Sequence, residues 1–249
     1  MATDHELAQD LATRAGALLL EIRAELHANG TDPKEMKDEG DRQAHELLMA
    51  ALAEARPNDA VLSEEGKDDA ARLTAERTWI VDPLDGTREF GEVPRDDWAV
   101  HVALVVAGQP IAGAVALPAQ GVTLSTASPA ALPAEPEGAL RFVASRTRPG
   151  PSADILTEHL NAEMVAMGSA GAKTMAVVQG AAEIYAHTGG QYEWDSCAPV
   201  AVARAAGLHT SRIDGSELVY NNEDPYLPDL LVCRPELADS VLEVLAANL

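Results

Sequence analysis

Apolar positions in the first quarter of the chain recur at helical spacing. The pattern between Leu7 and Leu26 predicts an amphipathic helix over residues 4–28. A second helical pattern follows Asp41 and ends before Pro57. Two helices are therefore expected before the first strand.

Short apolar runs then replace the helical pattern. Residues 60–66 and 77–82 each read as a strand that leads into acidic residues. Residues 97–128 read as three consecutive strands, with turns at Ala107-Gly108 and Gln120-Gly121. Consecutive strands joined by short turns predict an antiparallel meander.

The second half of the chain alternates between strand and helix patterns. It follows a segment rich in Pro and Ala, residues 128–138, which is the best candidate boundary. The expected strands are 140–145, 162–168, 182–188 and 228–233, and the expected helices are 151–161, 170–180, one after Trp194-Asp195, and 235–248. We therefore expect an α/β protein whose residues 1–249 form one unit. Its subdomains would be 1–130, with paired helices and an antiparallel sheet, and 139–249, of α/β type.

Charge narrows the classes of partner. The 249 residues include 40 Asp plus Glu against 18 Lys plus Arg, a formal net charge of −22. This sign disfavours nucleic acid polymers and anionic membranes. A small anionic substrate stays open if metal ions or local cations reverse the potential at its site.

Cysteine content and the N-terminus bear on the compartment. Cys197 and Cys233 lie far apart in sequence and are expected to be small buried hydrophobes in a reducing compartment. The first residues contain no basic stretch leading an apolar run, and no run approaches the roughly 20 apolar residues of a membrane span. We expect a cytoplasmic protein, either a monomer or a homodimer.

Acidic residues gather at the ends of three expected elements. Glu64-Glu65 follow one strand, Asp82 and Asp85 follow another, and Asp195 opens a helix. Each cluster alone has a simpler explanation, since acidic loop starts are common and Asp195 could be a helix N-cap. Together they match Mg²⁺, which takes oxygen ligands from several elements.

The stretch between Asp82 and Thr87 adds groups that suit an anion beside that metal. Pro83 fixes the backbone between the two aspartates, and the Leu84 carbonyl offers a further oxygen. Gly86 permits an unusual backbone angle and close approach, and Thr87 places a hydroxyl in the turn that follows. Metal, hydroxyl and exposed amides together indicate phosphate ester chemistry.

Three motifs make the sequence similar to a known family. "SEEG" at 63–66, "DPLDGT" at 82–87 and "EWDSCAP" at 193–199 resemble, in order and spacing, the motifs of the inositol monophosphatase superfamily. The resemblance covers nearly the whole chain. It implies a layered αβαβα sandwich and a Mg²⁺-dependent, lithium-sensitive phosphatase.

The resemblance also implies a set of site residues. The metal ligands for two Mg²⁺ ions, or three, would be Glu64, Asp82, the Leu84 carbonyl, Asp85 and Asp195. Glu65 would orient its loop, and a pair formed by Asp41 and Thr87 would activate the attacking water. The segment "KDEGDRQ" lacks the threonine-rich lead-in of the family, which leaves Asp38 as the alternative to Asp41.

Smaller features resemble the CysQ-type 3′(2′),5′-bisphosphate nucleotidase branch of that superfamily. They are "REF" after Thr87, "VASRTR" at 143–148 and "GSAGAK" at 168–173. The substrate-binding residues implied are Gly86, Thr87, Ser145, Arg148, Gly168, Ser169 and Lys173. Against this, "GSAGAK" could be only a tight strand–helix junction and Arg146 a surface residue. His187 could either line the pocket or simply end a strand.

The expected reaction is hydrolysis of the 3′-phosphate of 3′-phosphoadenosine 5′-phosphate to AMP and phosphate. The sulfated precursor of that nucleotide, an intermediate of sulfur assimilation, is a second expected substrate. An inositol monophosphatase or a fructose-1,6-bisphosphatase is the alternative within enzymes. A catalytically silent metal- or nucleotide-binding protein is the alternative outside them, although every expected metal ligand is present.

Overall fold

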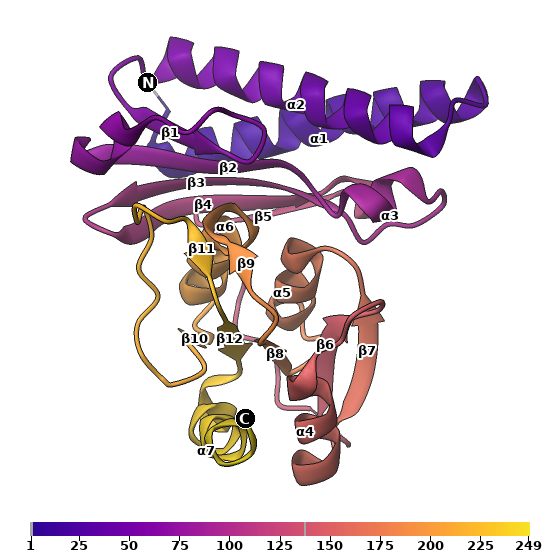
Figure 1. Cartoon of the computed structure of the whole chain (residues 1–249), viewed down its shortest axis with the longest axis vertical. Helices are drawn as coiled ribbons and strands as arrows, with labels where there is room; N and C mark the ends of the chain where they lie inside the picture. Colours follow the sequence, from indigo (N-terminus) through magenta and orange to yellow (C-terminus); the bar gives the residue numbers. More distant parts are fainter. Residues whose placement is uncertain (1, 137) are drawn as a thin grey trace.

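The computed structural model describes residues 2–136 and 138–249 as a stack of helical and sheet layers (Figure 1). The α-helices are α1 (Asp4–Ala28), α2 (Pro33–Ala55), α3 (Thr87–Gly91), α4 (Pro151–Leu160), α5 (Ala170–Val178), α6 (Glu193–Ala205) and α7 (Ala238–Asn248). In Figure 1, α1 and α2 cover one sheet, α5 and α6 lie between the two large sheets, and α4 and α7 lie on the far side of the second. The predicted αβαβα sandwich is confirmed.

The strands are β1 (Ala60–Ser63), β2 (Arg77–Asp85), β3 (Ala99–Val106), β4 (Gln109–Leu117), β5 (Val122–Ser125), β6 (Arg141–Ser145), β7 (Glu163–Met167), β8 (Ile184–His187), β9 (Gln191–Tyr192), β10 (His209–Ser211), β11 (Tyr226–Leu227) and β12 (Leu230–Cys233). The first sheet has the order β1-β2-β3-β4-β5. Its β3, β4 and β5 form the predicted antiparallel meander, whereas β1 pairs with β2 in parallel. Helix α1 packs on one face of this sheet and α6 on the other.

The N-terminal helices match the apolar pattern except at one end. Helix α1 has the predicted limits, but α2 begins at Pro33, so the predicted start after Asp41 is wrong. The Asp32 carboxylate caps the helix by accepting a hydrogen bond from Lys34 N at 2.8 Å, and Pro33 suits the first turn. Asp41 consequently lies inside α2 rather than at its beginning.

The second large sheet has the order β10-β12-β8-β6-β7. Strands β8, β6 and β7 run parallel, whereas β12 and β10 pair in the antiparallel sense. Both cysteines are free and buried, as predicted. The limits of the subdomains, 1–130 and 139–249, stay a prediction. No helix among the described residues is long and apolar enough to cross a membrane.

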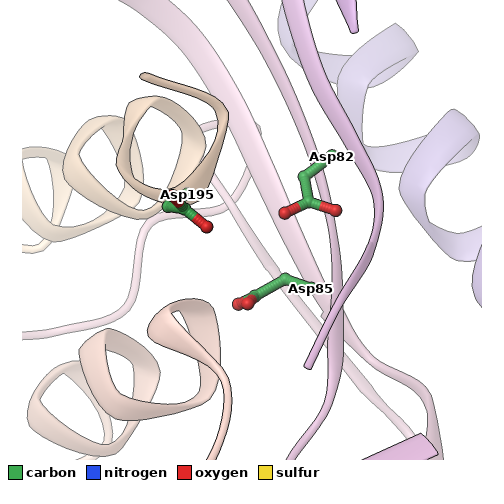
Figure 2. A group of neighbouring side chains, drawn as sticks. All are labelled: Asp82, Asp85 and Asp195. Atoms are coloured by element: carbon green, nitrogen blue, oxygen red, sulfur yellow. The ribbon is translucent and has the colours of Figure 1, made fainter. Parts of the chain in front are cut away.

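The end of one strand and the starts of two helices meet between the first sheet and the central helices. Strand β2 ends at Asp85, and the first turns of α5 and α6 approach it from the other layer (Figures 1 and 2). Backbone amides at a helix start are unpaired and carry partial positive charge. The fold therefore brings acidic side chains close to the starts of two helices, whose amides compensate part of their negative charge.

Candidate active site

The end of β2 is irregular where its two aspartates lie. Asp82 pairs with His101 and Asp85 with Ala99 on β3, so the register shifts between them. The Leu84 amide donates to Asp82 Oδ1 at 3.0 Å inside this bulge. Gly86 follows with a φ of 82°, a left-handed conformation that favours glycine. The bulge turns the Asp82 and Asp85 carboxylates towards one centre.

The third carboxylate of this centre comes from α6. Asp195 lies in the first turn of that helix, and its Oδ2 accepts a hydrogen bond from Tyr192 N at 2.6 Å. Each of Asp82, Asp85 and Asp195 offers an oxygen atom that lies within 4.8 Å of the others (Figure 2). We call these three residues the carboxylate cluster. The hydrogen bond from Tyr192 N holds the Asp195 carboxylate in place and still leaves Asp195 in the carboxylate cluster.

Electrostatics indicates that the cluster needs a cation. Burial, followed by the charges of Glu64, Asp85 and Asp195, raises the pKa of Asp82 well above its usual range. Burial and the charge of Asp85 raise the pKa of Asp195 to about 6. Buried carboxylates that repel one another are costly unless they are paired or bind metal. The donor set, all oxygen, fits Mg²⁺.

Glu64 lies beside the cluster at the end of β1. The residue as a whole is exposed, but its carboxylate is partly enclosed. This enclosure, together with the charges of Asp195, Asp85 and Glu65, raises the pKa of Glu64 to about 7. Glu64 therefore feels the same excess negative charge as the cluster, as a fourth metal ligand would.

Asp85 differs from its neighbours because α5 and a histidine compensate its charge. Its carboxylate accepts hydrogen bonds from Ser169 Oγ and from Gly171 N, the latter at 2.6 Å. Burial would raise the pKa of Asp85, but the positive charge of His101 and these donors lower it to about 2. Asp85 is therefore the permanently ionised member of the cluster.

His101 is one of the site residues that the sequence analysis missed. Its side chain is fully buried on β3; Nδ1 donates to Trp194 O at 2.9 Å, and Nε2 lies 3.2 Å from Asp85 Oδ2. This second pair is too poorly aligned for a hydrogen bond, so charge links the two groups. A Cβ atom at residue 171 would lie 2.0 Å from Nε2, which explains Gly171. A single histidine inside an apolar strand gives no functional signal in sequence.

The structure separates the two candidates for the water-activating aspartate. Asp38 is exposed and forms an ion pair with Lys34 at 2.5 Å. Asp41 is half-buried and faces the acidic loop: burial and the charges of Glu65 and Glu64 raise its pKa to about 7. Its position favours Asp41 over Asp38.

The predicted partner of Asp41 and the predicted loop residue lie near the same place. Thr87 Oγ1 donates to the Leu84 carbonyl at 3.1 Å, and among residues 2–136 and 138–249 no hydrogen bond joins Thr87 to Asp41. Glu65 is exposed and acts on Asp41 through its charge. The pairing of Asp41 with Thr87 therefore stays a prediction.

A pocket of about 620 Å³ extends from the carboxylate cluster along the second half of the chain. Asp85 and Asp195 line one part of it, and Tyr192 and Tyr226 line another. Every residue predicted to bind substrate lines this pocket: Gly86, Thr87, Ser145, Arg148, Gly168, Ser169 and Lys173. Segments far apart in sequence thus meet around one cavity of ligand size.

Some of the residues predicted to bind substrate already form hydrogen bonds within the protein. The Gly168 amide donates to Asp97 Oδ2 at 2.6 Å, and the Ser169 hydroxyl donates to Asp85. Lys173 is buried, and its Nζ donates to the Gly168 carbonyl. Burial lowers the pKa of Lys173 despite the nearby charge of Asp85. These contacts hold the start of α5 in place against β2.

The two residues whose roles the sequence left open have clear contacts. Arg146 forms ion pairs with Glu89 at 2.8 Å and Glu92 at 2.6 Å. His187 lines the pocket, and its Nε2 is hydrogen-bonded to the Gly190 carbonyl at 2.9 Å. Arg146 is therefore a bridge to α3 and to the residue that follows it, and His187 fixes the glycine turn before β9.

Comparison with known proteins gives concordant matches. The model of the inositol monophosphatase family matches residues 2–246. The 3′-phosphoadenosine 5′-phosphate phosphatase of Mycobacterium tuberculosis (strain CDC 1551 / Oshkosh) is 53% identical over 241 residues, which cover 93% of this chain and 89% of that protein. The 3′(2′),5′-bisphosphate nucleotidase CysQ of Escherichia coli (strain K12) is 31% identical over 239 residues, covering 87% and 94%.

Solved structures agree with these sequence matches. The crystal structure of CysQ from Bacteroides thetaiotaomicron, a bacterial member of the inositol monophosphatase family, superimposes with a TM-score of 0.77 at 30% identity. The match covers 93% of this chain and 97% of that one. The likeness therefore extends over nearly the whole chain.

Proposed function

The chain belongs to the inositol monophosphatase family and is a phosphatase, and we propose that it removes the 3′-phosphate of 3′-phosphoadenosine 5′-phosphate. The products would be AMP and inorganic phosphate. The proposal extends to the sulfated precursor of this nucleotide, to dependence on Mg²⁺ and to inhibition by lithium. The buried free cysteines support a reducing compartment such as the cytoplasm.

The observation that carries the proposal is the composition of the pocket. The acidic centre would serve the hydrolysis of any phosphate ester, but this pocket also has an aromatic wall. Tyr192 stacks on Trp194 with ring centroids 4.8 Å apart, and Tyr226 meets Tyr192 edge-on at 6.0 Å. Tyr192 and Tyr226 are about half exposed. Partly exposed aromatic rings suit a nucleobase, which stacks, better than an inositol or fructose ring.

The Arg148 side chain at the pocket supports the proposal that the substrate carries a second phosphate. Arg148 lines the pocket, and among the described residues its guanidinium forms no ion pair, in contrast to Arg146. The Arg148 amide donates to Ser145 Oγ at 3.3 Å, which shapes the loop that carries the guanidinium. Arginine pairs well with phosphate because its donors form a planar fork. We assign Arg148 to the 5′-phosphate.

The residues of the acidic centre would hold two Mg²⁺ ions through Glu64, Asp82, the Leu84 carbonyl, Asp85 and Asp195. When bound there, Mg²⁺ supplies the positive charge that phosphoryl transfer requires and acidifies the attacking water. The charge of His101 keeps Asp85 ionised for this purpose. The proximity of these ligands to one another supports a single metal-binding site.

The proton of the attacking water would pass to Asp41. A general base works best when its pKa lies near the working pH, and in the metal-free protein burial and the charges of Glu65 and Glu64 raise the pKa of Asp41 to about 7. Thr87 and Gly86 line the pocket at the start of α3, where they would orient a phosphoryl group. Glu65 would hold the loop that presents Glu64.

The proposal predicts a clear order of substrates. We expect kcat/KM for 3′-phosphoadenosine 5′-phosphate to exceed that for inositol 1-phosphate and fructose 1,6-bisphosphate by about 100-fold or more, because a site built for one set of polar groups rejects analogues that lack them. Phosphate release with Mg²⁺, measured with and without lithium, checks this. A preference for either sugar ester would favour the alternative enzymes, and no release would favour the silent binder.

The Arg148→Met variant sharpens this comparison. Loss of one charge-assisted contact to phosphate should raise KM for the nucleotide by about 10–100-fold. Hydrolysis of inositol 1-phosphate, which has a single phosphate, should change little. If both substrates are affected equally, Arg148 does not recognise the 5′-phosphate.

A further inference from the structure

A buried arginine lies between two loops that flank the acidic centre. Arg72, only 1% exposed, belongs to a short 3-10 helix (Ala70–Thr74) in the segment that leaves Glu64-Glu65. Its Nε and Nη2 donate to the two carboxylate oxygens of Asp68 at 2.7 and 2.9 Å. This paired contact fixes the plane of the guanidinium and leaves Nη1 facing elsewhere.

The remaining donor of Arg72 reaches a segment about 150 residues further along the chain. Nη1 donates to Asn221 Oδ1 at 2.9 Å and to the Asn222 carbonyl at 2.8 Å. Asn221 Nδ2 donates back to the Arg72 carbonyl at 3.0 Å. The acidic loop and the loop before β11 are thus joined by reciprocal hydrogen bonds around a buried charge.

Glu193 continues this connection to the carboxylate cluster. It is fully buried at the start of α6, two residues before Asp195. Its carboxylate accepts hydrogen bonds from Asn221 N at 2.6 Å, from Asn222 N at 2.8 Å and from Asn222 Nδ2 at 2.8 Å. A buried carboxylate with three donors is held in one position. The helix turn that carries Asp195 is held with it.

We propose that Arg72, Asn221, Asn222 and Glu193 form a positioning network that fixes the acidic loop with Glu64 relative to Asp195. The inference rests on the proposed metal-dependent function. Glu64 and Asp195 carry like charges that repel each other before a cation arrives. A scaffold that holds them close pre-organises the centre, and residues that orient metal ligands contribute to affinity without touching the metal. None of the four network residues lines the pocket.

The test is Mg²⁺ binding to the free protein, measured by isothermal titration calorimetry without substrate. Arg72→Met should weaken Mg²⁺ binding about 10–100-fold, the usual effect of losing a partner that orients metal ligands. The Mg²⁺ concentration for half-maximal phosphate release should rise by a similar factor, whereas kcat at saturating Mg²⁺ should stay within about threefold of wild type. A general loss of structure would lower kcat as well.

Arg234→Met is the matched control. Arg234 is also buried, at 5% exposed, and donates to the carbonyls of Pro133 and Ala134 and to Glu236, away from the acidic centre. It should lower the unfolding temperature and leave Mg²⁺ affinity unchanged. Asn222→Ala, a change at an exposed residue, tests the same network without removing a buried charge and should weaken Mg²⁺ binding severalfold.

Coupling between the ends of the network gives the decisive result. Arg72 acts on Glu193 through the 221–222 loop, so the two substitutions should break the same connection. The double variant Arg72→Met/Glu193→Gln should therefore have about the same Mg²⁺ affinity as whichever single variant, Arg72→Met or Glu193→Gln, binds Mg²⁺ less tightly. Additive losses, or Mg²⁺ affinities of Arg72→Met and Asn222→Ala within twofold of wild type, would overturn the network. A wild-type protein that binds no Mg²⁺ would instead overturn the metal function on which it rests.

Discussion

Replacing Asp82 by Asn should lower phosphate release about 1,000-fold and, at the same time, stabilise the protein without metal. The loss corresponds to ~4 kcal/mol of transition-state stabilisation, in the range that metal ions supply. The gain arises because the buried Asp82 carboxylate is repelled by Glu64, Asp85 and Asp195 and has a raised pKa. Asn carries no charge and needs no proton on folding, so the variant should have an unfolding temperature, measured in a chelator, about 2–4 °C higher.

Asp59→Asn is the control for this variant. Asp59 is also nearly buried, but it accepts hydrogen bonds from Arg77 Nε at 2.9 Å and Trp79 Nε1 at 2.8 Å. Its replacement should lower the unfolding temperature and leave kcat unchanged. Activity of Asp82→Asn within tenfold of wild type would contradict the metal mechanism. A lower unfolding temperature of metal-free Asp82→Asn than of the metal-free wild type would contradict the proposed repulsion among the carboxylates.

Mg²⁺ affinity should rise steeply with pH. The pKa values of Glu64, about 7, and Asp195, about 6, are raised, so without metal these groups keep protons that the unfolded chain releases near pH 4. The contribution of these two groups to the stability of the metal-free fold is therefore fully present below about pH 4 and is lost as pH rises through 6–7. Mg²⁺ must displace these protons, so its affinity should increase about 100-fold from pH 5.5 to 7.5.

Calorimetry in two buffers with different ionisation enthalpies measures this effect and counts the protons released. Stability of the metal-free protein, followed by thermal unfolding, should fall over the same pH interval in which Mg²⁺ affinity rises. Affinity that does not change between pH 5.5 and 7.5, with no proton release, would mean that these carboxylates do not bind the ion.

The motifs predicted much of the acidic centre because its ligands sit at fixed places in short segments. Asp82 and Asp85 share one turn, so their spacing indicated that they converge, whereas Asp195 was joined to them by the resemblance of its tryptophan–aspartate motif to that of the family. The periodicity of 4–28 and of the meander predicted α1 and β3–β5 for the same reason, since one face of each is buried over many residues.

The elements that were missed depend on contacts between distant segments. Strands β9 and β11 have two residues each, too few for any apolar period. His101 and Arg72 have partners 16 or more residues away at the site, and neither position differs in sequence from an ordinary core or surface residue. The early start of α2 was readable from Asp32-Pro33, but the charged residues that follow hide the apolar face.

The central claim is that the acidic centre hydrolyses the 3′-phosphate of an adenine nucleotide with the help of Mg²⁺. The most direct measurement is phosphate release from 3′-phosphoadenosine 5′-phosphate by protein stripped of metal and then titrated with Mg²⁺, with the nucleoside product identified by chromatography. We predict no release until Mg²⁺ is added, and AMP as the product. Release that persists in chelator, or adenosine 3′-phosphate as the product, would contradict the account.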